Sequence, residues 1–254
     1  MPPIFAPMPA QPHDHIIPFS ESEKTKKEQV AEMFDKIAGK YDFMNRFLSA
    51  RTDVSWRKKA INSLKKHQPQ YILDIATGTG DMAIRSFKML NPKQITGVDI
   101  STQMLEEGRK KIEKLGLSQH IKLEKGDSEN LHFADASFDA VMAAFGVRNF
   151  ENLEKGLSEM RRVLKPGGQL CIIEFSRPKP AFINSLYQLY MSVVAPQIAK
   201  AFKQDKQAYQ YLNKSAKAFP ERKDFTAILD KVGFKNSGYK ALTFGMCCIY
   251  SASK

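Results

Sequence analysis

Long apolar runs, a secretory leader and paired cysteines are all missing from this sequence. No stretch of the 254 residues approaches the roughly 20 apolar residues that a membrane-spanning helix requires. The N-terminus has no basic segment followed by an apolar run. The three cysteines have neither disulfide-framework nor metal-site spacing, and adjacent Cys247 and Cys248 would point to opposite faces of a strand. We therefore expect a cytoplasmic protein without a metal site.

Charge is strongly biased toward basic residues. Lysine and arginine outnumber acidic residues 39 to 27, which gives a net charge of +12 and an isoelectric point near 9.5. Such a surface suits nucleic acid or an anionic membrane, or is simply well solvated. The basic residues are not interleaved with aromatic residues in a recognisable module, so we expect no nucleic-acid partner.

Periodicity divides the chain into a terminal segment and one domain. Residues 1–23 are rich in proline and have little periodic pattern, so we predict that they lack fixed structure. A helical pattern of apolar residues runs over Val30–Leu48, where Gly39 predicts two short helices or a bend. A second amphipathic segment covers Trp56–Leu64. The length of the remainder predicts a single domain over 24–254.

From residue 71 onward, short apolar strands alternate with helical segments. Strand patterns occur at 71–75, 94–99, 121–124, 138–143 and 170–174, and two more flank Gly245. This alternation predicts an α/β protein with a doubly wound, mostly parallel seven-stranded sheet, the Rossmann-like architecture, with helices on both faces. The aromatic-rich segment 180–219 is too long for a tight connection, so we predict an inserted helical cap there.

The loop after the first strand has the composition of a nucleotide-binding loop. That strand contains Asp74, and Gly78, Thr79 and Gly80 open the next helix, where glycines let backbone amides approach a ligand closely. The next strand ends in Asp99, about 20 residues later, where a carboxylate suits the two hydroxyls of a ribose. We therefore predict cofactor contacts from these five residues, at the carboxyl edge of the sheet.

The same loop fits a dinucleotide fingerprint, so an NAD-dependent oxidoreductase is the rival interpretation. Three features favour S-adenosylmethionine instead. Asp74 stands within the glycine motif, as is common where a zwitterionic amino-acid group is held. Asp127 and Ser128 follow the third strand, where they would meet an adenine edge, and 164–168 (Leu-Lys-Pro-Gly-Gly) forms a turn common in methyltransferases. A role in local turns or tight packing is the structural alternative for these residues.

Longer motifs carry a more specific resemblance. They lie at 33–45, 77–81, 145–149 (Phe-Gly-Val-Arg-Asn), 160–168 and 174–176. In these motifs the chain resembles the quinone-biosynthesis C-methyltransferases, which methylate demethylmenaquinol and related ubiquinone precursors. The likeness runs from about residue 27 to the C-terminus. Tyr41-Asp42 and the Phe-Gly-x-Arg-Asn motif are its most specific parts, because generic methyltransferases lack them.

The resemblance implies a class I methyltransferase fold with S-adenosylmethionine as cofactor. The family's cofactor residues fall on Thr79, Asp99, Asp127 and Ser128. Some relatives have a serine contact just before the Phe-Gly-x-Arg-Asn motif. This chain has Ala144 there, so a side-chain hydroxyl contact is lost.

The implied reaction is C-methylation of demethylmenaquinol to menaquinol. The ring carbon becomes strongly nucleophilic when the neighbouring hydroxyl, with a pKa of about 10, loses its proton. Arg148 would stabilise the phenolate, while Tyr41 and Asn149 would position the hydroxyl or a water. No single base follows from the sequence, since Asp42 and a water relay are both open. A core role for Tyr41 and a structural ion pair for Arg148 are the alternatives.

Other acceptors and other roles for the cap are open at this stage. A ubiquinone precursor, a sterol or a polyketide would also suit a methyltransferase for apolar molecules. The 180–219 cap and the Val30–Leu48 helices would line a tunnel for a prenyl tail, whereas ordinary core or a homodimer surface would equally account for the aromatic residues. Basic residues around the mouth would hold the enzyme on an anionic membrane leaflet, as a peripheral protein.

Overall fold

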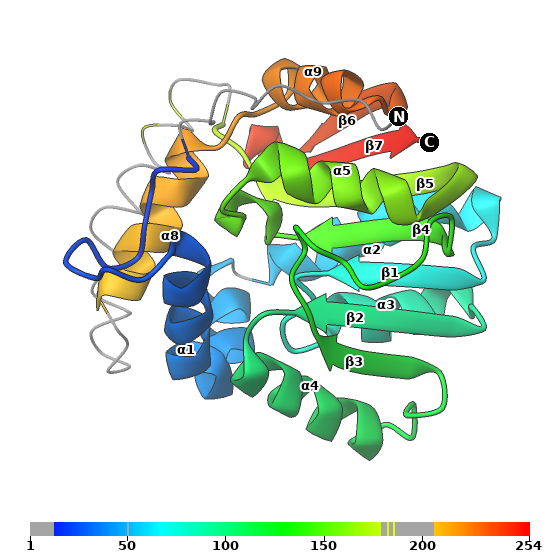
Figure 1. The fold of residues 1–254 in the computed structure, drawn as a ribbon, viewed down its shortest axis with the longest axis horizontal. Coiled ribbons are helices and arrows are strands. Elements are labelled where there is room, and N and C mark those ends of the chain that lie inside the picture. The colour runs from blue at the N-terminus through cyan, green and yellow to red at the C-terminus, as the bar shows by residue number, and fades with distance from the viewer. Residues whose placement is uncertain (1–12, 50, 179–181, 183–184, 186–205) are drawn as a thin grey trace.

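A seven-stranded sheet organises the computed structural model, which describes residues 13–49, 51–178, 182, 185 and 206–254 (Figure 1). The strands are β1 (Tyr71–Ile75), β2 (Gln94–Asp99), β3 (Ile121–Lys125), β4 (Phe138–Ala144), β5 (Leu164–Phe175), β6 (Lys235–Leu242) and β7 (Cys247–Ser253). Their order is β3-β2-β1-β4-β5-β7-β6, and β7 alone runs antiparallel to both of its neighbours. The prediction of a doubly wound, mostly parallel sheet of seven strands is confirmed.

Helices cover both faces of this sheet. They are α1 (Lys26–Leu48), α2 (Thr52–Leu64), α3 (Asp81–Leu90), α4 (Thr102–Lys114), α5 (Leu153–Val163), α8 (Lys206–Ala218) and α9 (Lys223–Val232), with short 3-10 turns η1 (Lys65–His67), η2 (Val147–Asn149) and η4 (Thr243–Gly245). In Figure 1, α5 and α9 lie in front of the sheet, and α2 and α3 lie behind it. Helices α1 and α8 lie beyond the carboxyl ends of the parallel strands.

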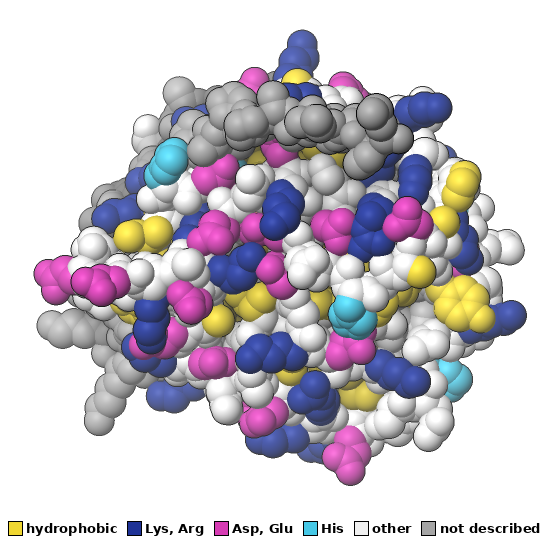
Figure 2. Space-filling view, viewed as in Figure 1, with side chains coloured by type: hydrophobic (Ala, Val, Ile, Leu, Met, Phe, Trp, Pro, Cys, Tyr) yellow, Lys and Arg dark blue, Asp and Glu magenta, His cyan; other side chains and the backbone are white. Residues whose placement is uncertain are grey.

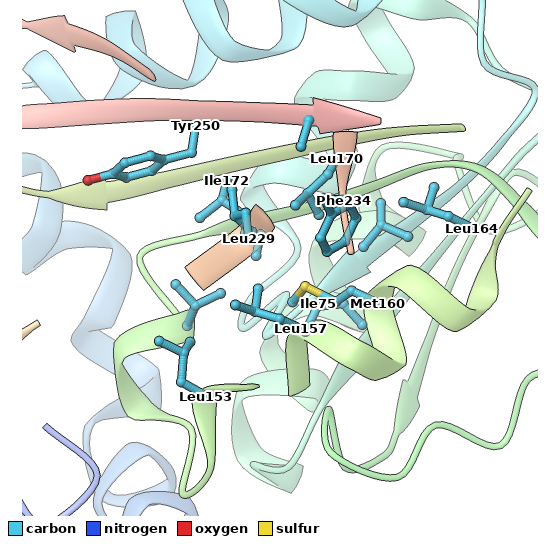
Figure 3. Close-up of a cluster of buried hydrophobic side chains, with 14 of the residues drawn as sticks. Ile75, Leu153, Leu157, Met160, Leu164, Leu170, Ile172, Leu229, Phe234 and Tyr250 are labelled. Atoms are coloured by element: carbon cyan, nitrogen blue, oxygen red, sulfur yellow. The ribbon is translucent and has the colours of Figure 1, made fainter. Parts of the chain in front are cut away.

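Alternating strand residues form a separate apolar core on each face. Figure 3 shows the core beneath α5, where Leu157 and Met160 lie close to Ile75 of the sheet. The opposite core joins side chains of α2, α3 and α4 to the other face of the sheet. Cys247 belongs to this second core and Cys248 to the first, as their alternation along a strand predicts. All three cysteines are free.

Two local predictions are wrong. Helix α1 is continuous through Gly39, because its buried apolar face packs on α4 and α8 and outweighs the cost of about 1 kcal/mol for one helical glycine. The predicted turn at 164–168 lies inside β5. It forms an irregularity there, since the pairing with β4 jumps from Phe138↔Leu164 to Ala140↔Gln169.

The N-terminal segment and the cap are described in part. Residues 13–23 differ from the expected lack of structure, because Lys26 Nζ donates to the carbonyl of His13 (2.8 Å) and Gln29 accepts from the amide of Phe19 (2.8 Å). The rest of 1–23 lies outside the described residues, as does most of the predicted cap at 180–219. Its described part includes α8, which packs against α1. No helix in the described ranges has the length and apolarity to cross a bilayer.

Candidate active site

A pocket of about 660 Å³, open mouth included, lies where β1, β2 and β4 end beneath α1. Seven of the residues predicted for the site line it: Tyr41, Gly78, Asp99, Asp127, Ser128, Ala144 and Asn149. Segments far apart in the sequence therefore meet here, as expected for the carboxyl edge of a parallel sheet.

Asp99 is a partly buried carboxylate on the pocket wall. Its Oδ2 accepts from the amide of Gly78 (2.7 Å) and its Oδ1 from the amide of Ser101 (2.9 Å). Burial raises the pKa of Asp99 to about 6, although these backbone donors oppose the shift. The carboxylate therefore fixes the glycine loop and lines the pocket with the same side chain.

Strained backbone surrounds the pocket on two sides. The loop after β1 has positive φ at Ala76 (52°), Gly78 (55°) and Gly80 (76°), and the residue after β4, Phe145, has φ 62°. Such values are uncommon for residues with a side chain and concentrate at functional sites. The two loops touch, because a Cβ added to Gly146 would lie 2.4 Å from the Cβ of Ala76. Gly146 thus lets the Phe-Gly-x-Arg-Asn motif pack on the glycine loop.

Asp127 and Ser128 lie on the pocket wall after β3. Lys27 of α1 donates to Asp127 Oδ2 (2.6 Å), and the amide of Glu129 donates to Oδ1 (2.9 Å). Lys27 Nζ is also 3.5 Å from Glu129. This ion pair ties the start of α1 to the loop that would meet the adenine ring.

Four predicted site residues do not line the pocket: Asp74, Thr79, Gly80 and Arg148. Asp74 lies behind the loop and accepts from the hydroxyl of Thr77 (2.7 Å). Burial raises the pKa of Asp74 to about 7. Gly80 starts α3 and faces the side chains of Leu123 and Ile112.

Thr79 belongs to a charged network, which we call the α1 latch and define as Asp42, Arg46, Thr79, Asp81 and Lys111. Thr79 donates to Asp42 Oδ1 (2.6 Å), and Lys111 of α4 donates to Asp42 (2.6 Å), Thr79 (2.8 Å) and Asp81 (2.8 Å). Arg46 pairs with Asp81 (2.9 Å). Both oxygens of Asp42 therefore accept hydrogen bonds, and the latch joins α1 to the glycine loop.

Arg148 is buried on η2 and pairs with Glu174 at the carboxyl end of β5. Its Nη1 also donates to the carbonyl of Phe145 (2.8 Å), and its guanidinium lies 5.3 Å from the ring centre of Phe175. Burial raises the pKa of the Glu174 carboxyl, against the opposing effect of Arg148. Two charges thus lie side by side in a dry environment next to the pocket.

Tyr41 lines the pocket wall and is influenced by the charge of Arg148. Burial raises the pKa of its phenol, and the positive charge of Arg148 acts in the opposite direction. Asn149 follows Arg148 and lines the pocket, with its Oδ1 unpartnered among the described residues. The structure therefore places all three predicted catalytic residues at one end of the pocket or next to it.

Sequence reasoning did not single out Lys27, Phe34, Glu129 or Glu174 as site residues. The first three line the pocket. Their positions depend on how α1 docks, which no local pattern encodes. Glu174 had a usable signal, because it is a carboxylate one residue before the end of a buried apolar strand, much as Asp99 is the last residue of β2. No cluster of three potential metal ligands occurs in the described part of the chain.

Comparisons with known proteins agree with this geometry. The model of the ubiE/COQ5 methyltransferase family matches residues 22–254. A demethylmenaquinone methyltransferase of Bacteroides fragilis is 46% identical over 96% of this chain and 99% of its own length. A ubiquinone/menaquinone biosynthesis C-methyltransferase of Geotalea daltonii is 41% identical over 90% of this chain and 97% of its own.

Solved structures support the fold. A SAM-dependent methyltransferase of Thermotoga maritima superposes with a TM-score of 0.61 and 20% identity over 88% of this chain and 99% of that one. A SAM-dependent methyltransferase of Aquifex aeolicus gives a TM-score of 0.53 and 20% identity over 72% of this chain and 81% of that one. At such identities the likeness extends to the architecture alone.

Proposed function

The chain belongs to the ubiE/COQ5 methyltransferase family, and we propose that it methylates a ring carbon of demethylmenaquinol to give menaquinol. It is an S-adenosylmethionine-dependent C-methyltransferase, which sets aside the NAD-dependent oxidoreductase. The observation that supports the acceptor best is the match to demethylmenaquinone methyltransferases along nearly the whole chain. A ubiquinone precursor is the second candidate, because other relatives of similar identity are named for both quinones.

The pocket fits S-adenosylmethionine chemically. The partly buried Asp99 carboxylate suits the ribose hydroxyls, and Asp127 and Ser128 suit the adenine edge. Gly78 lines the pocket and has the positive φ that a close backbone approach requires, and Ala144 lines the pocket after it. Gly80 has positive φ at the start of α3, while Asp74 and Thr79 hold the loop through hydrogen bonds with Thr77 and Asp42. When bound, the cofactor supplies a methyl group that is already electrophilic. The protein's remaining work is alignment and activation of the acceptor carbon.

The Arg148 end of the site would activate the acceptor. A guanidinium in a dry environment stabilises a developing phenolate far more than it would in water. Tyr41 and Asn149 line the pocket, and Arg148 directly precedes Asn149 on η2, so the two lining residues would orient the ring hydroxyl. Their roles follow from the motif resemblance and from this placement.

We place the enzyme in the cytoplasm, working as a peripheral protein on an anionic leaflet where a prenylated quinol resides. The net charge of +12 supports this location. Acidic and basic side chains intermix on the face in Figure 2, so a docking surface would lie on another face. Co-sedimentation with anionic and with neutral vesicles tests the proposal. Equal partition to both would contradict it.

The decisive assay is radiolabelled methyl transfer from S-adenosylmethionine to reduced demethylmenaquinone in detergent. The oxidised quinone is the matched control, because it has no hydroxyl to ionise. Label in menaquinone with the reduced acceptor alone is the expected result. If calorimetry shows cofactor binding while neither quinone form accepts label, the acceptor assignment is wrong.

A further inference from the structure

Among the buried polar atoms that have no hydrogen-bond partner in the described part of the chain, three belong to the Arg148–Glu174 pair and to a tyrosine that both charges influence. They are Arg148 Nε, Glu174 Oε2 and the hydroxyl of Tyr211. The exposed fractions of these residues are 3%, 0% and 2%. An unmade hydrogen bond at a buried polar atom costs roughly 1–3 kcal/mol, and three together demand an explanation.

The three groups come from three different elements, η2, β5 and α8. Helix α8, which holds Tyr211, packs on η2, which holds Arg148. Burial raises the pKa of the Tyr211 phenol, Arg148 lowers it, and Glu174 raises it further, so both charges act on this hydroxyl. Glu174 Oε1 is already occupied, by Arg148 and by the amide of Phe175 (3.0 Å). Its Oε2 is the acceptor that is left over.

We propose that Arg148, Glu174 and Tyr211 form the binding site for the acceptor's ring hydroxyl, and that Glu174 Oε2 takes the hydroxyl proton. The inference rests on the proposed function, since it needs an acceptor that carries a phenolic hydroxyl. Such a hydroxyl can donate to Glu174 and accept from Arg148 Nε or Tyr211, and so satisfies the unpartnered atoms. This assignment names a base that the sequence left open.

Asp42 is a poorer base than Glu174. Its two oxygens already accept hydrogen bonds from Thr79 and Lys111, so neither is left over for an acceptor hydroxyl. Glu174 is wholly buried, its Oε2 has no partner among the described residues, and burial raises its pKa above the ordinary value of a glutamate. Arg148 keeps the carboxylate available and then neutralises the phenolate that forms.

The step balances without a redox partner. The acceptor hydroxyl gives its proton to Glu174, and its O–H electron pair stays on the ring oxygen. The ring carbon then bonds the methyl carbon, while the S–CH3 electron pair stays on sulfur, which becomes neutral. The hydrogen of the methylated carbon leaves to water as a proton, and the ring oxygen takes its proton back from Glu174. The net products are the methylated quinol, the demethylated cofactor and one proton.

The test compares Glu174→Gln with the wild type on two reduced naphthoquinols with the same prenyl tail. One is demethylmenaquinol, and the other bears chlorine on the distal ring, which makes its hydroxyl more acidic. Loss of a general base should cost on the order of 100-fold or more in kcat with demethylmenaquinol. The deficit should shrink at least about tenfold with the acidic acceptor, because that acceptor ionises without help. Glu154→Gln, at another buried glutamate paired to a lysine, is the matched control and should keep the wild-type rate.

A deficit of the same size with both acceptors would indicate a structural role and overturn the inference, as would a Glu174→Gln rate within threefold of wild type. Calorimetry with S-adenosylmethionine checks that the variant is folded. If it is not, Tyr211→Phe decides: we expect about a tenfold loss that also shrinks with the acidic acceptor, and an unchanged rate would overturn the site. A wild-type enzyme that methylates neither quinol would instead refute the proposed function.

Discussion

Two charged clusters flank the cofactor pocket, and they differ in how completely their polar atoms are satisfied. In the α1 latch, Lys111 donates to three different oxygens, and its side chain is 30% exposed. In the Arg148–Glu174 pair, both residues are buried and each retains an unpartnered atom. A satisfied, half-solvated network holds a helix in place, whereas a dry, unsatisfied one is prepared to receive a ligand.

The largest effect is expected from removing one partner of the buried Arg148–Glu174 pair. Arg148→Met leaves Glu174 buried without its cation, which should lower the free energy of unfolding by about 3–5 kcal/mol. Adding Glu174→Gln to it should recover part of that loss, since the uncompensated charge is gone. Urea unfolding of both variants measures the difference. Equal stability of Arg148→Met and wild type would mean that Glu174 is not held as an ionised partner.

The next largest effect is expected at the contact between Gly146 and Ala76, where the Phe-Gly-x-Arg-Asn motif packs on the glycine loop. Gly146→Ala should cost about 1–3 kcal/mol of stability, because its Cβ would lie 2.4 Å from that of Ala76. The double variant Ala76→Gly, Gly146→Ala should restore most of the loss, since φ 52° at residue 76 also suits glycine. Thermal unfolding with and without S-adenosylmethionine measures both. Failure of the double variant to recover would show that the clash is elsewhere.

The next prediction concerns Asp99, a carboxylate of the pocket wall that belongs to neither charged cluster. Its protonation should make cofactor binding depend on pH. Its pKa of about 6 means that it is mostly ionised at pH 7 and mostly protonated at pH 5. Ribose hydroxyls donate to the ionised form, so the Kd for S-adenosylmethionine should rise about tenfold between pH 7 and pH 5. Calorimetry at four pH values measures this rise. Asp99→Asn should bind the cofactor weakly, with a Kd that does not change with pH. The control Asp74→Asn should keep the pH dependence of the wild type. A Kd that still rises toward pH 5 in Asp99→Asn would assign the pH dependence to another group.

The smallest effect is expected from a substitution in the α1 latch. Lys111→Met removes three donated hydrogen bonds, but Asp42 and Asp81 are partly exposed and gain water, so stability should fall by only about 1 kcal/mol. The Kd for S-adenosylmethionine should rise modestly, because α1 contributes Lys27 and Phe34 to the pocket wall. High salt should reduce the difference between this variant and wild type. A loss as large as that of Arg148→Met would contradict the distinction between the two clusters.

Local patterns predicted the strands of the parallel sheet, because a buried strand corresponds to a short apolar run in the sequence. They missed the continuity of α1 through Gly39, since that depends on packing against α4 and α8. They also placed a turn at 164–168, where pairing with β4 keeps the chain in the sheet with an irregularity. Both errors arise where partners distant in sequence outweigh local propensity.

The site shows the same division. Gly78, Asp99, Asp127 and Ser128 follow strand ends, and the topology of a parallel sheet brings such residues to one edge. Thr79 lies in the same loop, but its hydroxyl forms hydrogen bonds with Asp42 and Lys111 and does not line the pocket. Which way one side chain points depends on the helices packed behind the loop, and no spacing rule contains that information.

The sequence by itself determined the sheet, the edge at which the pocket opens and, through its motifs, the family, because strand runs and glycine loops are local in the chain. Only the tertiary structure decided which polar residues anchor and which are left unsatisfied. Asp42 and Glu174 are both carboxylates in recognisable motifs. Their difference lies in burial and in the partners that α4, α8 and η2 bring, and hydrogen-bond satisfaction is a property of the assembled fold.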